Sequence, residues 1–256
     1  MAASSKQTAQ PFGVDFGGSG IKGAPVDLGT GEFAAKRIRY ETPVGGRPRD
    51  VVGVIAELVD QGASAGAPVG ITVPAVVVRG VVKSAANIDA SWIDTDAATL
   101  FRDRLQRDVV VVNDADAAGL AEVRYGAARD ESGLVVLTTL GTGIGTALVY
   151  DGMLVPNSEL GHIEVDGNDA ETVAANSVRE KEDLSWEQWA DRLTAYYRTL
   201  ERLLSPDLFV VGGGVSKHAD RFLPLLDIET RIVPATLRNT AGIVGAAVLA
   251  TEAHAS

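Results

Sequence analysis

Short apolar runs separated by glycine-rich turns make up the first part of the chain and predict β-strands. The predicted strands are residues 12–16, 21–26, 32–40, 69–73 and 109–112. From residue 48 the apolar residues recur three and four positions apart, which is typical of a helix with one buried face. A second helix is predicted at about 94–106. The first part therefore has the order strand, strand, strand, helix, strand, helix, strand.

The second part of the chain begins the same order again. The predicted strands are residues 134–138, 146–150, 153–155 and 208–211, with a glycine turn at 140–145. Helical periodicity covers residues 170–181, 186–204 and 240–251. The pattern therefore predicts two α/β halves of similar construction.

A direct comparison of the halves supports an internal duplication. When the chain is shifted along itself, Gly18-Ser19-Gly20-Ile21 falls on Gly141-Thr142-Gly143-Ile144, and Gly29 falls on Gly152. Two glycine-hydroxyl-glycine turns thus occupy matching places between predicted strands. Chance agreement between glycine-rich hairpins is the alternative, but repetition at a fixed spacing favours duplication.

Composition narrows the class of protein. The chain has 256 residues, a net charge of −11 and no cysteine. Its acidity argues against nucleic acid or an anionic membrane as a partner. The absence of cysteine excludes disulfides, thiolate catalysis and cysteine-zinc sites. Residues 1–10 lack the apolar stretch of a signal peptide and no apolar run is long enough to span a bilayer, so we expect a cytoplasmic protein.

The paired turns are candidate phosphate sites. Backbone N–H groups in a turn of small residues approach an anion without interference from Cβ, and Ser or Thr adds a hydroxyl donor. One such turn is weak evidence, because glycine also makes ordinary hairpins, but two matching turns can hold a phosphate chain from both sides. The candidates are Gly17, Gly18, Ser19 and Gly20 in the first turn and Gly141, Thr142 and Gly143 in the second.

Two charged residues flank the first turn. Asp15 could orient Mg²⁺ through water, because Mg²⁺ keeps much of its hydration shell. Lys22 could neutralise a phosphate oxygen. The alternative is that Asp15 caps the turn and Lys22 is solvated at a strand edge. Beside the duplicated turns, we favour phosphate and Mg²⁺ binding.

The motifs around these residues resemble a known family. Asp15-Phe16-Gly17-Gly18-Ser19-Gly20 and Leu140-Gly141-Thr142-Gly143-Ile144-Gly145 look like the phosphate motifs of the actin-like, hexokinase-type fold. Together with Asn113-Asp114 and Glu159-Leu160-Gly161-His162, they resemble the ROK sugar kinases, in particular the polyphosphate glucokinase branch. The similarity runs from about residue 12 to residue 249.

This resemblance implies a duplicated α/β fold of the ribonuclease H-like type, with two lobes and a cleft between them. We expect a disordered lead-in at 1–11, a smaller lobe at 12–114 and a larger lobe at 115–239. Helix 240–252 would pack back on the first lobe. The resemblance further implies a homodimer and phosphoryl transfer from inorganic polyphosphate, ATP or both to the 6-hydroxyl of glucose, with mannose as a further candidate substrate.

The resemblance also implies which carboxylate takes the proton. Phosphoryl transfer to a hydroxyl needs a general base, and a carboxylate at the end of a strand suits that role. Asn113-Asp114 follows the strand 109–112, so Asp114 is the predicted base and Asn113 a sugar contact. The same pair could instead cap a helix beginning near residue 115, and Asp116 is an alternative carboxylate.

The segment Glu159-Leu160-Gly161-His162-Ile163-Glu164 is the most specific short motif. Sugar hydroxyls both donate and accept hydrogen bonds, so a carboxylate beside an imidazole fits them. The resemblance implies that Glu159 and His162 bind hydroxyls, with Asn87 and Glu171 as further sugar contacts. Typical family members follow this motif with a zinc-binding cysteine cluster. Residues 165–183 contain no cysteine, so no structural zinc is predicted and His162 is left for the sugar.

The donor is the least determined part of the prediction. Val210-Val211-Gly212-Gly213-Gly214-Val215 resembles the family's donor-side loop, which adds Gly213 and Gly214, although strand-to-helix punctuation explains these glycines equally well. Polyphosphate would need a cationic track. Its candidates are Lys22, Lys83, Arg124, Arg129 and Lys217. They are scattered in sequence, so the polyphosphate prediction rests mainly on the resemblance.

Other functions fit parts of the sequence. A non-catalytic sugar sensor of the repressor type would need an N-terminal helix-turn-helix, for which the residues before Phe12 leave no room. An actin-like ATPase of assembly would leave Glu159 and His162 unexplained. An ATP-only kinase of another hexose or an N-acetylated sugar stays open, because acceptance of mannose depends on the space around one hydroxyl.

Overall fold

The computed structural model describes residues 9–86 and 88–255. The chain forms two compact units: unit 1 is Met1–Ala117 with Gly242–Ser256, and unit 2 is Ala118–Ala241. The boundaries expected from the sequence, after residues 114 and 239, lie within three residues of these limits. Most of the predicted lead-in, and Asn87, lie outside the described residues.

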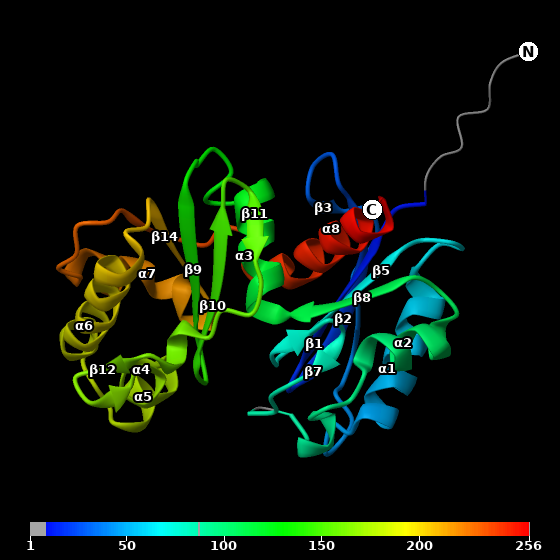
Figure 1. The fold of residues 1–256 in the computed structure, drawn as a ribbon, viewed down its shortest axis with the longest axis horizontal. Helices are drawn as coiled ribbons and strands as arrows, with labels where there is room; N and C mark the ends of the chain where they lie inside the picture. Colours follow the sequence, from blue (N-terminus) through cyan, green and yellow to red (C-terminus); the bar gives the residue numbers. More distant parts are fainter. Residues whose placement is uncertain (1–8, 87, 256) are drawn as a thin grey trace, which may run out of the picture. The chain divides into compact units, whose positions relative to one another are not determined.

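Unit 1 is built on one mixed sheet with the strand order β3-β2-β1-β5-β8, and β4 pairs with β2 (Figure 1). β1 and β2 form an antiparallel hairpin, whereas β1, β5 and β8 run parallel. The strands are β1 (Phe12–Gly17), β2 (Gly20–Asp27), β3 (Glu32–Phe33), β4 (Ile38–Tyr40), β5 (Val69–Val73) and β8 (Val109–Asn113). A separate two-stranded ribbon pairs β6 (Val77–Val78) with β7 (Val81–Val82).

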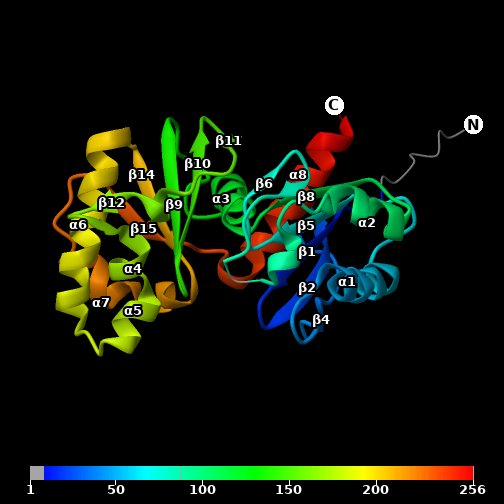
Figure 2. The same cartoon turned by 60° about the horizontal axis from the view of Figure 1, so that its bottom comes forward.

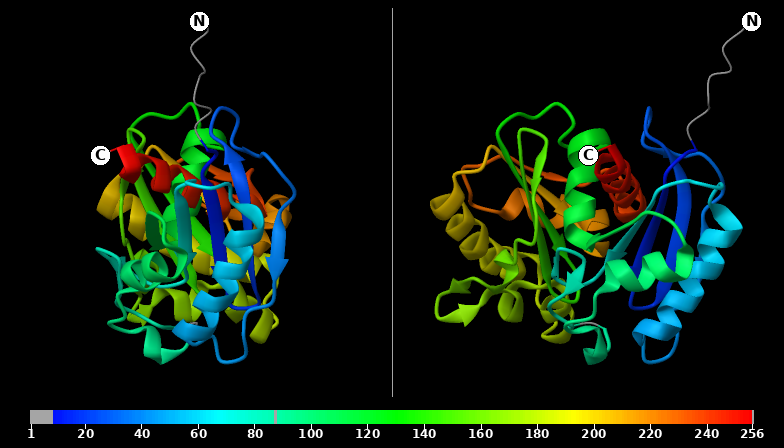
Figure 3. Two further views of the ribbon diagram at one scale, coloured as in Figure 1. Left: turned by 90° about the vertical axis from the view of Figure 1, so that its right-hand side faces the viewer. Right: turned by 45° about the vertical axis from the view of Figure 1, so that its right-hand side comes forward.

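The two faces of this sheet are covered by different helices (Figure 3). Phe12, Val14 and Phe16 alternate along β1 and join the core formed with α1 (Pro48–Gly62) and α2 (Ala97–Leu105). The opposite face receives α8 (Ala241–Ala255). A Cβ at Gly13 would stand 1.9 Å from the carbonyl oxygen of Ile243, so glycine is required for this close approach.

Unit 2 repeats the arrangement, with the strand order β11-β10-β9-β14-β15. The β9–β10 hairpin corresponds to β1–β2, and β9, β14 and β15 run parallel like β1, β5 and β8. The strands are β9 (Leu134–Leu140), β10 (Ile144–Tyr150), β11 (Met153–Val155), β14 (Leu208–Gly212) and β15 (Ile232–Pro234). A small ribbon pairs β12 (Glu164–Val165) with β13 (Asn168–Asp169). The duplication inferred from the sequence is therefore present in the topology.

One face of the unit 2 sheet packs on α6 (Trp186–Leu204; Figure 2). Trp189, Tyr196 and Tyr197 of this helix are fully buried. The other face receives α3 (Asp114–Tyr125), where a Cβ at Gly119 would stand 2.5 Å from the Cβ of Ala147. The shorter helices of this unit are α4 (Ala170–Ala174), α5 (Asn176–Lys181) and α7 (Ala219–Phe222), with 3₁₀ turns η2 (Leu160–His162), η3 (Gly214–His218) and η4 (Leu223–Leu225).

The predicted strand 32–40 is wrong as one element. It is divided into β3 and β4, because Pro25 of β2 accepts the N–H of Ala34 at 2.9 Å but has no N–H to donate in return. The helix predicted from residue 94 begins at Ala97, since the Asp96 side chain caps it through the N–H of Thr99.

The predicted helix 170–181 is also divided. Ala175 is extended, with φ −61° and ψ 152°, and separates α4 from α5. The N–H of Ser177 donates to the carbonyl oxygen of Gly141 at 3.0 Å and so leaves the helical ladder. This break ties α5 to the second glycine turn. By contrast, the helix predicted at 186–204 is confirmed with the same bounds.

Within the described ranges, no helix is both long and apolar enough to cross a membrane.

Candidate functional site

The first glycine turn closes the β1–β2 hairpin, where Gly17 pairs with Gly20. Gly18 and Ser19 are exposed at its tip. No heavy atom lies within 4 Å of the position that a Cβ on Gly18 would take, and its φ is outside the left-handed region. Neither packing nor backbone conformation therefore requires glycine at position 18. The open space above it is available to a ligand.

Asp15 and Lys22 face each other across the same hairpin. The Lys22 Nζ lies 3.2 Å from the Oδ2 of Asp15, and the Thr72 hydroxyl donates to Oδ1 at 3.2 Å. The side chain of Asp15 is 23% exposed and that of Lys22 is 28% exposed. The structure thus pairs a carboxylate and an ammonium directly behind the first turn.

The second glycine turn, Gly141–Gly143, is held from α5 and α4. The Ser177 hydroxyl donates to the carbonyl oxygen of Thr142 at 2.6 Å. The N–H of Ile144 donates to the Oε2 of Glu171 at 3.0 Å, and a Cβ on Gly143 would stand 2.2 Å from that oxygen. Gly141, which matches Gly18 in the duplication, again has no heavy atom within 4 Å of its Cβ position.

A third glycine segment adjoins the second turn within unit 2. Gly213 has φ +82°, and a Cβ there would stand 2.5 Å from the carbonyl oxygen of Leu140. Glycine is therefore required at 213 by both conformation and packing. Gly214 begins η3 and is open, with no heavy atom within 4 Å of its Cβ position. The candidate donor residues of this unit thus form two neighbouring loops.

Asn113 and Asp114 occupy the junction between β8 and α3 in unit 1. The Asn113 Oδ1 accepts the N–H groups of Ala115 and Asp116 at 2.8 and 3.1 Å, and its Nδ2 donates to the carbonyl oxygen of Ala75 at 3.1 Å. Asn113 therefore caps α3, as the alternative interpretation of the sequence allowed. Asp114 is exposed, whereas Asp116 is 1% exposed, so Asp114 is the more accessible carboxylate.

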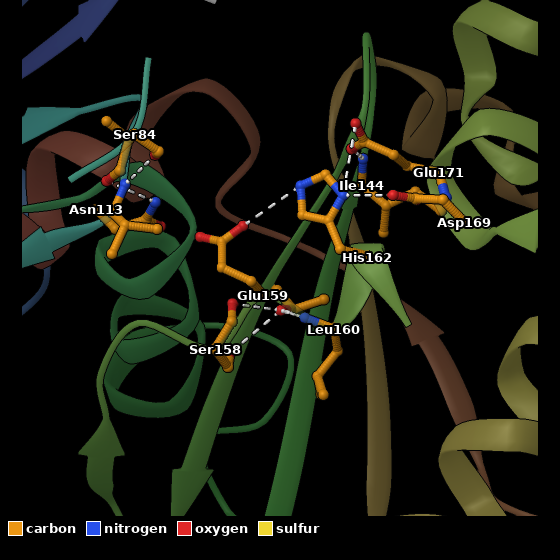
Figure 4. Close-up of polar contacts among 12 residues, drawn as sticks. Ser84, Asn113, Ile144, Ser158, Glu159, Leu160, His162, Asp169 and Glu171 are labelled. Carbon is orange, nitrogen blue, oxygen red and sulfur yellow. Dashed lines mark hydrogen bonds and ion pairs between the residues drawn. The ribbon is translucent and has the colours of Figure 1, made fainter. Parts of the chain in front are cut away.

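The predicted sugar motif forms a compact polar cluster in unit 2 (Figure 4). The His162 Nδ1 lies 2.9 Å from the Oδ2 of Asp169 and 4.0 Å from the Oε1 of Glu171. The His162 Nε2 lies 4.0 Å from the Oε2 of Glu159. Gly161 makes this possible, because a Cβ there would stand 2.1 Å from the carbonyl oxygen of Ile144. The structure thus brings together Glu159, His162 and Glu171, the three residues of unit 2 that the resemblance implied as sugar contacts.

The cluster alters the ionisation of two members. The hydrogen bond with Asp169 raises the pKa of His162, and the nearby Glu171 and Glu159 carboxylates act in the same direction. Partial burial raises the pKa of Glu159, while His162 opposes the shift and Glu171 supports it. The imidazolium form of His162 is therefore favoured beside these carboxylates.

Asp169 is a site residue that sequence reasoning missed. It caps α4 through the N–H of Glu171 while its other oxygen contacts His162. The available signal was its place as a polar residue at the start of a predicted helix, which describes an ordinary cap. Its contact with His162 arises from the β12–β13 turn, which no local pattern revealed.

Metal ligands are sparse among the described residues. No group of three or more His, Cys, Asp or Glu side chains there is arranged to hold a metal ion. Asp15 offers a single carboxylate behind the first glycine turn, which fits a magnesium ion that arrives with a phosphate donor and keeps most of its water. It does not form a resident metal centre.

Comparison with known proteins identifies the family. The ROK family model matches residues 11–176, well over half of the chain. The chain belongs to the ROK family. This ROK chain is 52% identical over 237 residues to a polyphosphate glucokinase of Mycobacterium tuberculosis, with 92% of this chain and 89% of that protein covered.

Solved structures of ROK proteins agree in fold. An inorganic polyphosphate/ATP-glucomannokinase from Arthrobacter sp. strain KM superposes with a TM-score of 0.90 at 51% identity, covering 96% of this chain and 100% of that one. A ROK family glucokinase from Streptomyces griseus, solved with glucose and AMPPNP, gives a TM-score of 0.79 at 25% identity, covering 95% and 99%. The actin-like, hexokinase-type α/β fold predicted from the sequence is confirmed.

Proposed function

We propose that this ROK protein is a glucokinase that transfers a phosphoryl group from inorganic polyphosphate or ATP to the 6-hydroxyl of glucose, with mannose as a second substrate. The observation that carries the proposal is the hydrogen bond from Ile144 to Glu171. Through it, the sugar-motif cluster of His162 and the second glycine turn share one residue. Sugar recognition and phosphate binding would thereby be coupled within unit 2, which supports a sugar kinase.

In the proposed reaction Asp114 acts as the general base. Its carboxylate accepts the proton of the 6-hydroxyl as that oxygen bonds to the terminal phosphorus of the donor. The bond between this phosphorus and its bridging oxygen breaks, and ADP or a polyphosphate shortened by one unit leaves. Asp114 is exposed at the first turn of α3, so its carboxylate is accessible to a substrate.

The sugar is held by groups of complementary hydrogen-bonding character. Glu159 accepts hydrogen bonds from hydroxyls, and His162 presents its Nε2 while Nδ1 is engaged by Asp169. Asn113 retains one amide hydrogen beyond its bond to Ala75. Asn87 completes the predicted set. Within unit 2, Glu159 and His162 would together orient the sugar ring.

The glycine turns hold the donor in this proposal. Gly18 and Gly141 leave room for phosphate oxygens to approach the backbone N–H groups. Asp15 would contact, through water, a magnesium ion bound to the donor, and that ion would supply positive charge to the phosphates. Lys22, held beside Asp15, would add a positive charge. A homodimer and a cytoplasmic location remain predictions.

The test is glucose phosphorylation by the purified protein with Mg²⁺, comparing inorganic polyphosphate with ATP as donor. Glucose 6-phosphate from both donors is the expected result. Product from ATP alone would refute the polyphosphate assignment while keeping the kinase. Product from neither, with glucose, mannose and N-acetylated hexoses all tried, would favour a sugar sensor of the same fold.

A further inference from the structure

A cationic and aromatic cluster lies in unit 2 outside the residues discussed so far. The Cζ atom of Arg179 lies 4.2 Å from the ring centroid of Trp186, and the Cζ of Arg221 lies 5.2 Å from the same centroid. The imidazole ring of His218 is 5.7 Å away. We name these four residues the Trp186 cluster. It gathers side chains from α5, α6, η3 and α7.

The segments that carry this cluster are continuous with the glycine loops of unit 2. Arg179 follows Ser177, whose N–H and hydroxyl donate to Gly141 and Thr142 at 3.0 and 2.6 Å. His218 ends the 3₁₀ turn that starts at Gly214, and Arg221 lies in the helix directly after it. Each glycine loop is therefore connected to a segment that carries an arginine, and both arginines lie against the ring of Trp186.

The chemistry of the cluster suits a phosphate chain. A guanidinium stacked on an aromatic ring keeps its N–H edge for phosphate oxygens. Phe222 stacks on Trp186 with an interplanar angle of 13°, and the two guanidinium groups also contact the ring. The ring is thus occupied by protein groups instead of being offered to a purine base.

Carboxylates lie near both arginines. Arg179 is 20% exposed, its Nη2 forms an ion pair with Glu180 at 3.6 Å, and its Nε donates to the Oδ1 of Asn176 at 3.1 Å. The pKa of Glu187 is lowered mainly by its own backbone N–H and by the Ser185 hydroxyl, and the charge of Arg221 adds to this effect. Lys217 is exposed on η3 between the loop and His218. A chain with one negative charge on every phosphate can meet several of these cations at once, which a single carboxylate cannot do.

The other cations suggested by the sequence fit a track less well. Lys22 is paired with Asp15 at 3.2 Å, and Lys83 with Asp94 at 2.8 Å. Arg129 precedes β9, at the opposite end of that strand from the second glycine turn. Seven residues of strand span about 20 Å, so Arg129 does not continue the loop.

We propose that the Trp186 cluster binds the part of an inorganic polyphosphate chain that lies beyond the phosphoryl group being transferred. This inference rests on the proposed kinase function and extends it to the far end of the donor. ATP has no phosphates beyond its triphosphate, so the cluster should serve polyphosphate and not ATP.

The experiment compares Arg221→Gln, Arg179→Lys and Arg179→Gln with wild type, using long-chain polyphosphate, tripolyphosphate and ATP in turn. The matched control is Arg202→Gln, an exposed arginine in the last turn of α6, more than 20 Å along that helix from Trp186 at about 1.5 Å per residue. KM for each donor is measured at two salt concentrations, with circular dichroism and thermal unfolding to confirm folding.

The expected result is a KM for long-chain polyphosphate raised about 3- to 10-fold in Arg221→Gln and Arg179→Gln, with a weaker salt dependence. KM for ATP and tripolyphosphate should stay within about twofold, Arg179→Lys should retain part of the affinity because it keeps the charge, and Arg202→Gln should match wild type.

Two outcomes would overturn the inference, and they are distinguishable. In the first outcome, wild type uses polyphosphate, but the variants keep their affinity for both donors or lose affinity for ATP and polyphosphate equally. This result would reject the role of the Trp186 cluster in polyphosphate binding and leave the kinase function standing. Wild type that phosphorylates glucose from ATP but neither uses nor binds polyphosphate would reject the donor assignment together with the cluster.

Discussion

At the scale of single residues, the contact between His162 and Asp169 carries the most chemical consequence. Asp169 engages Nδ1 at 2.9 Å and leaves Nε2 directed toward Glu159. A carboxylate that fixes one ring nitrogen sets both the orientation of the ring and its charge. Asp169 is therefore expected to position His162 instead of contacting the sugar itself.

Asp169→Asn tests this role through the titration of His162. Losing the carboxylate removes the largest cause of the raised pKa, so the imidazole should titrate at lower pH than in wild type. NMR titration of the His162 ring protons measures the change. KM for glucose should rise by about 3- to 10-fold, since one oriented hydrogen bond is lost.

The same variant has a signed effect on stability. Because the folded pKa of His162 is raised, its pairing with Asp169 stabilises the fold fully below the unfolded pKa and loses that effect as pH rises through the folded value. Asp169→Asn should therefore destabilise the protein more near pH 5.5 than near pH 8.5. Asp166→Asn is the control, because Asp166 is exposed with φ +50°, which asparagine tolerates. An unchanged His162 titration would contradict the positioning role.

At the scale of elements, the three glycine loops contain both glycines that the fold requires and glycines that it does not require. Gly213 is required by its φ of +82° and by contact with Leu140, whereas Gly18 and Gly141 meet nothing within 4 Å. The fold therefore gives no packing reason for glycine at positions 18 and 141, and in the proposed function this space receives the donor phosphates.

Gly18→Ala and Gly141→Ala should leave the fold intact and weaken the donor. A methyl group in the open space would obstruct phosphate oxygens, so KM for either donor should rise by about tenfold or more, with KM for glucose within about twofold. Steady-state kinetics and thermal unfolding measure both effects. Gly53→Ala on α1, equally free of contacts, should leave kinetics unchanged and stabilise the helix slightly. Equal donor KM in all three variants would refute the phosphate role of the turns.

Most elements could be predicted because their apolar periodicity is strong. The helix Trp186–Leu204 was predicted with its bounds from a long amphipathic pattern, and the structure shows that Ser185 and Gln188 form a capping box at its start. The divisions within 32–40 and 170–181 were missed because each depends on a partner distant in sequence, Pro25 for one and Gly141 for the other. Local pattern carries no information about such partners.

For the site, the family resemblance named Glu159, His162 and Glu171 as sugar contacts, and the structure shows that their side chains lie close together. The sequence did not predict Asp169, whose contact depends on a turn, or the stacking of Arg179 and Arg221 on Trp186. The sequence also left Asp114 and Asp116 as alternatives for the general base. Only the structure shows that Asp114 is exposed and Asp116 is buried.

At the scale of the whole molecule, the chain passes between the units twice, after Ala117 and after Ala241. Near both of these points, on the unit 2 side, the chain is hydrogen-bonded to the side chain of Glu122, which is 1% exposed. Its carboxylate accepts the N–H groups of Ala127, Thr236 and Leu237 at 2.8, 3.1 and 2.7 Å. One buried side chain thus joins α3 to the segment that leads into α8.

Glu122→Gln should destabilise the protein by about 2–4 kcal/mol, because an amide group must replace a buried carboxylate that accepts three N–H groups. Urea unfolding measures the loss. Glu57→Gln, an exposed position on α1, should change the free energy of unfolding by less than about 0.5 kcal/mol. Similar free energies of unfolding for the two variants would show that the hydrogen bonds of Glu122 do not stabilise these segments.

The central claim is that the protein phosphorylates glucose with Asp114 as the base, and one comparison tests it most directly. Glucose 6-phosphate formation is measured for wild type and Asp114→Asn at saturating glucose, with glucose binding measured separately by calorimetry. We expect wild-type turnover, a fall of about 10²- to 10⁴-fold in the variant, and a glucose Kd within about threefold of wild type. Wild type that forms no glucose 6-phosphate, or a variant as fast as wild type, would contradict the account.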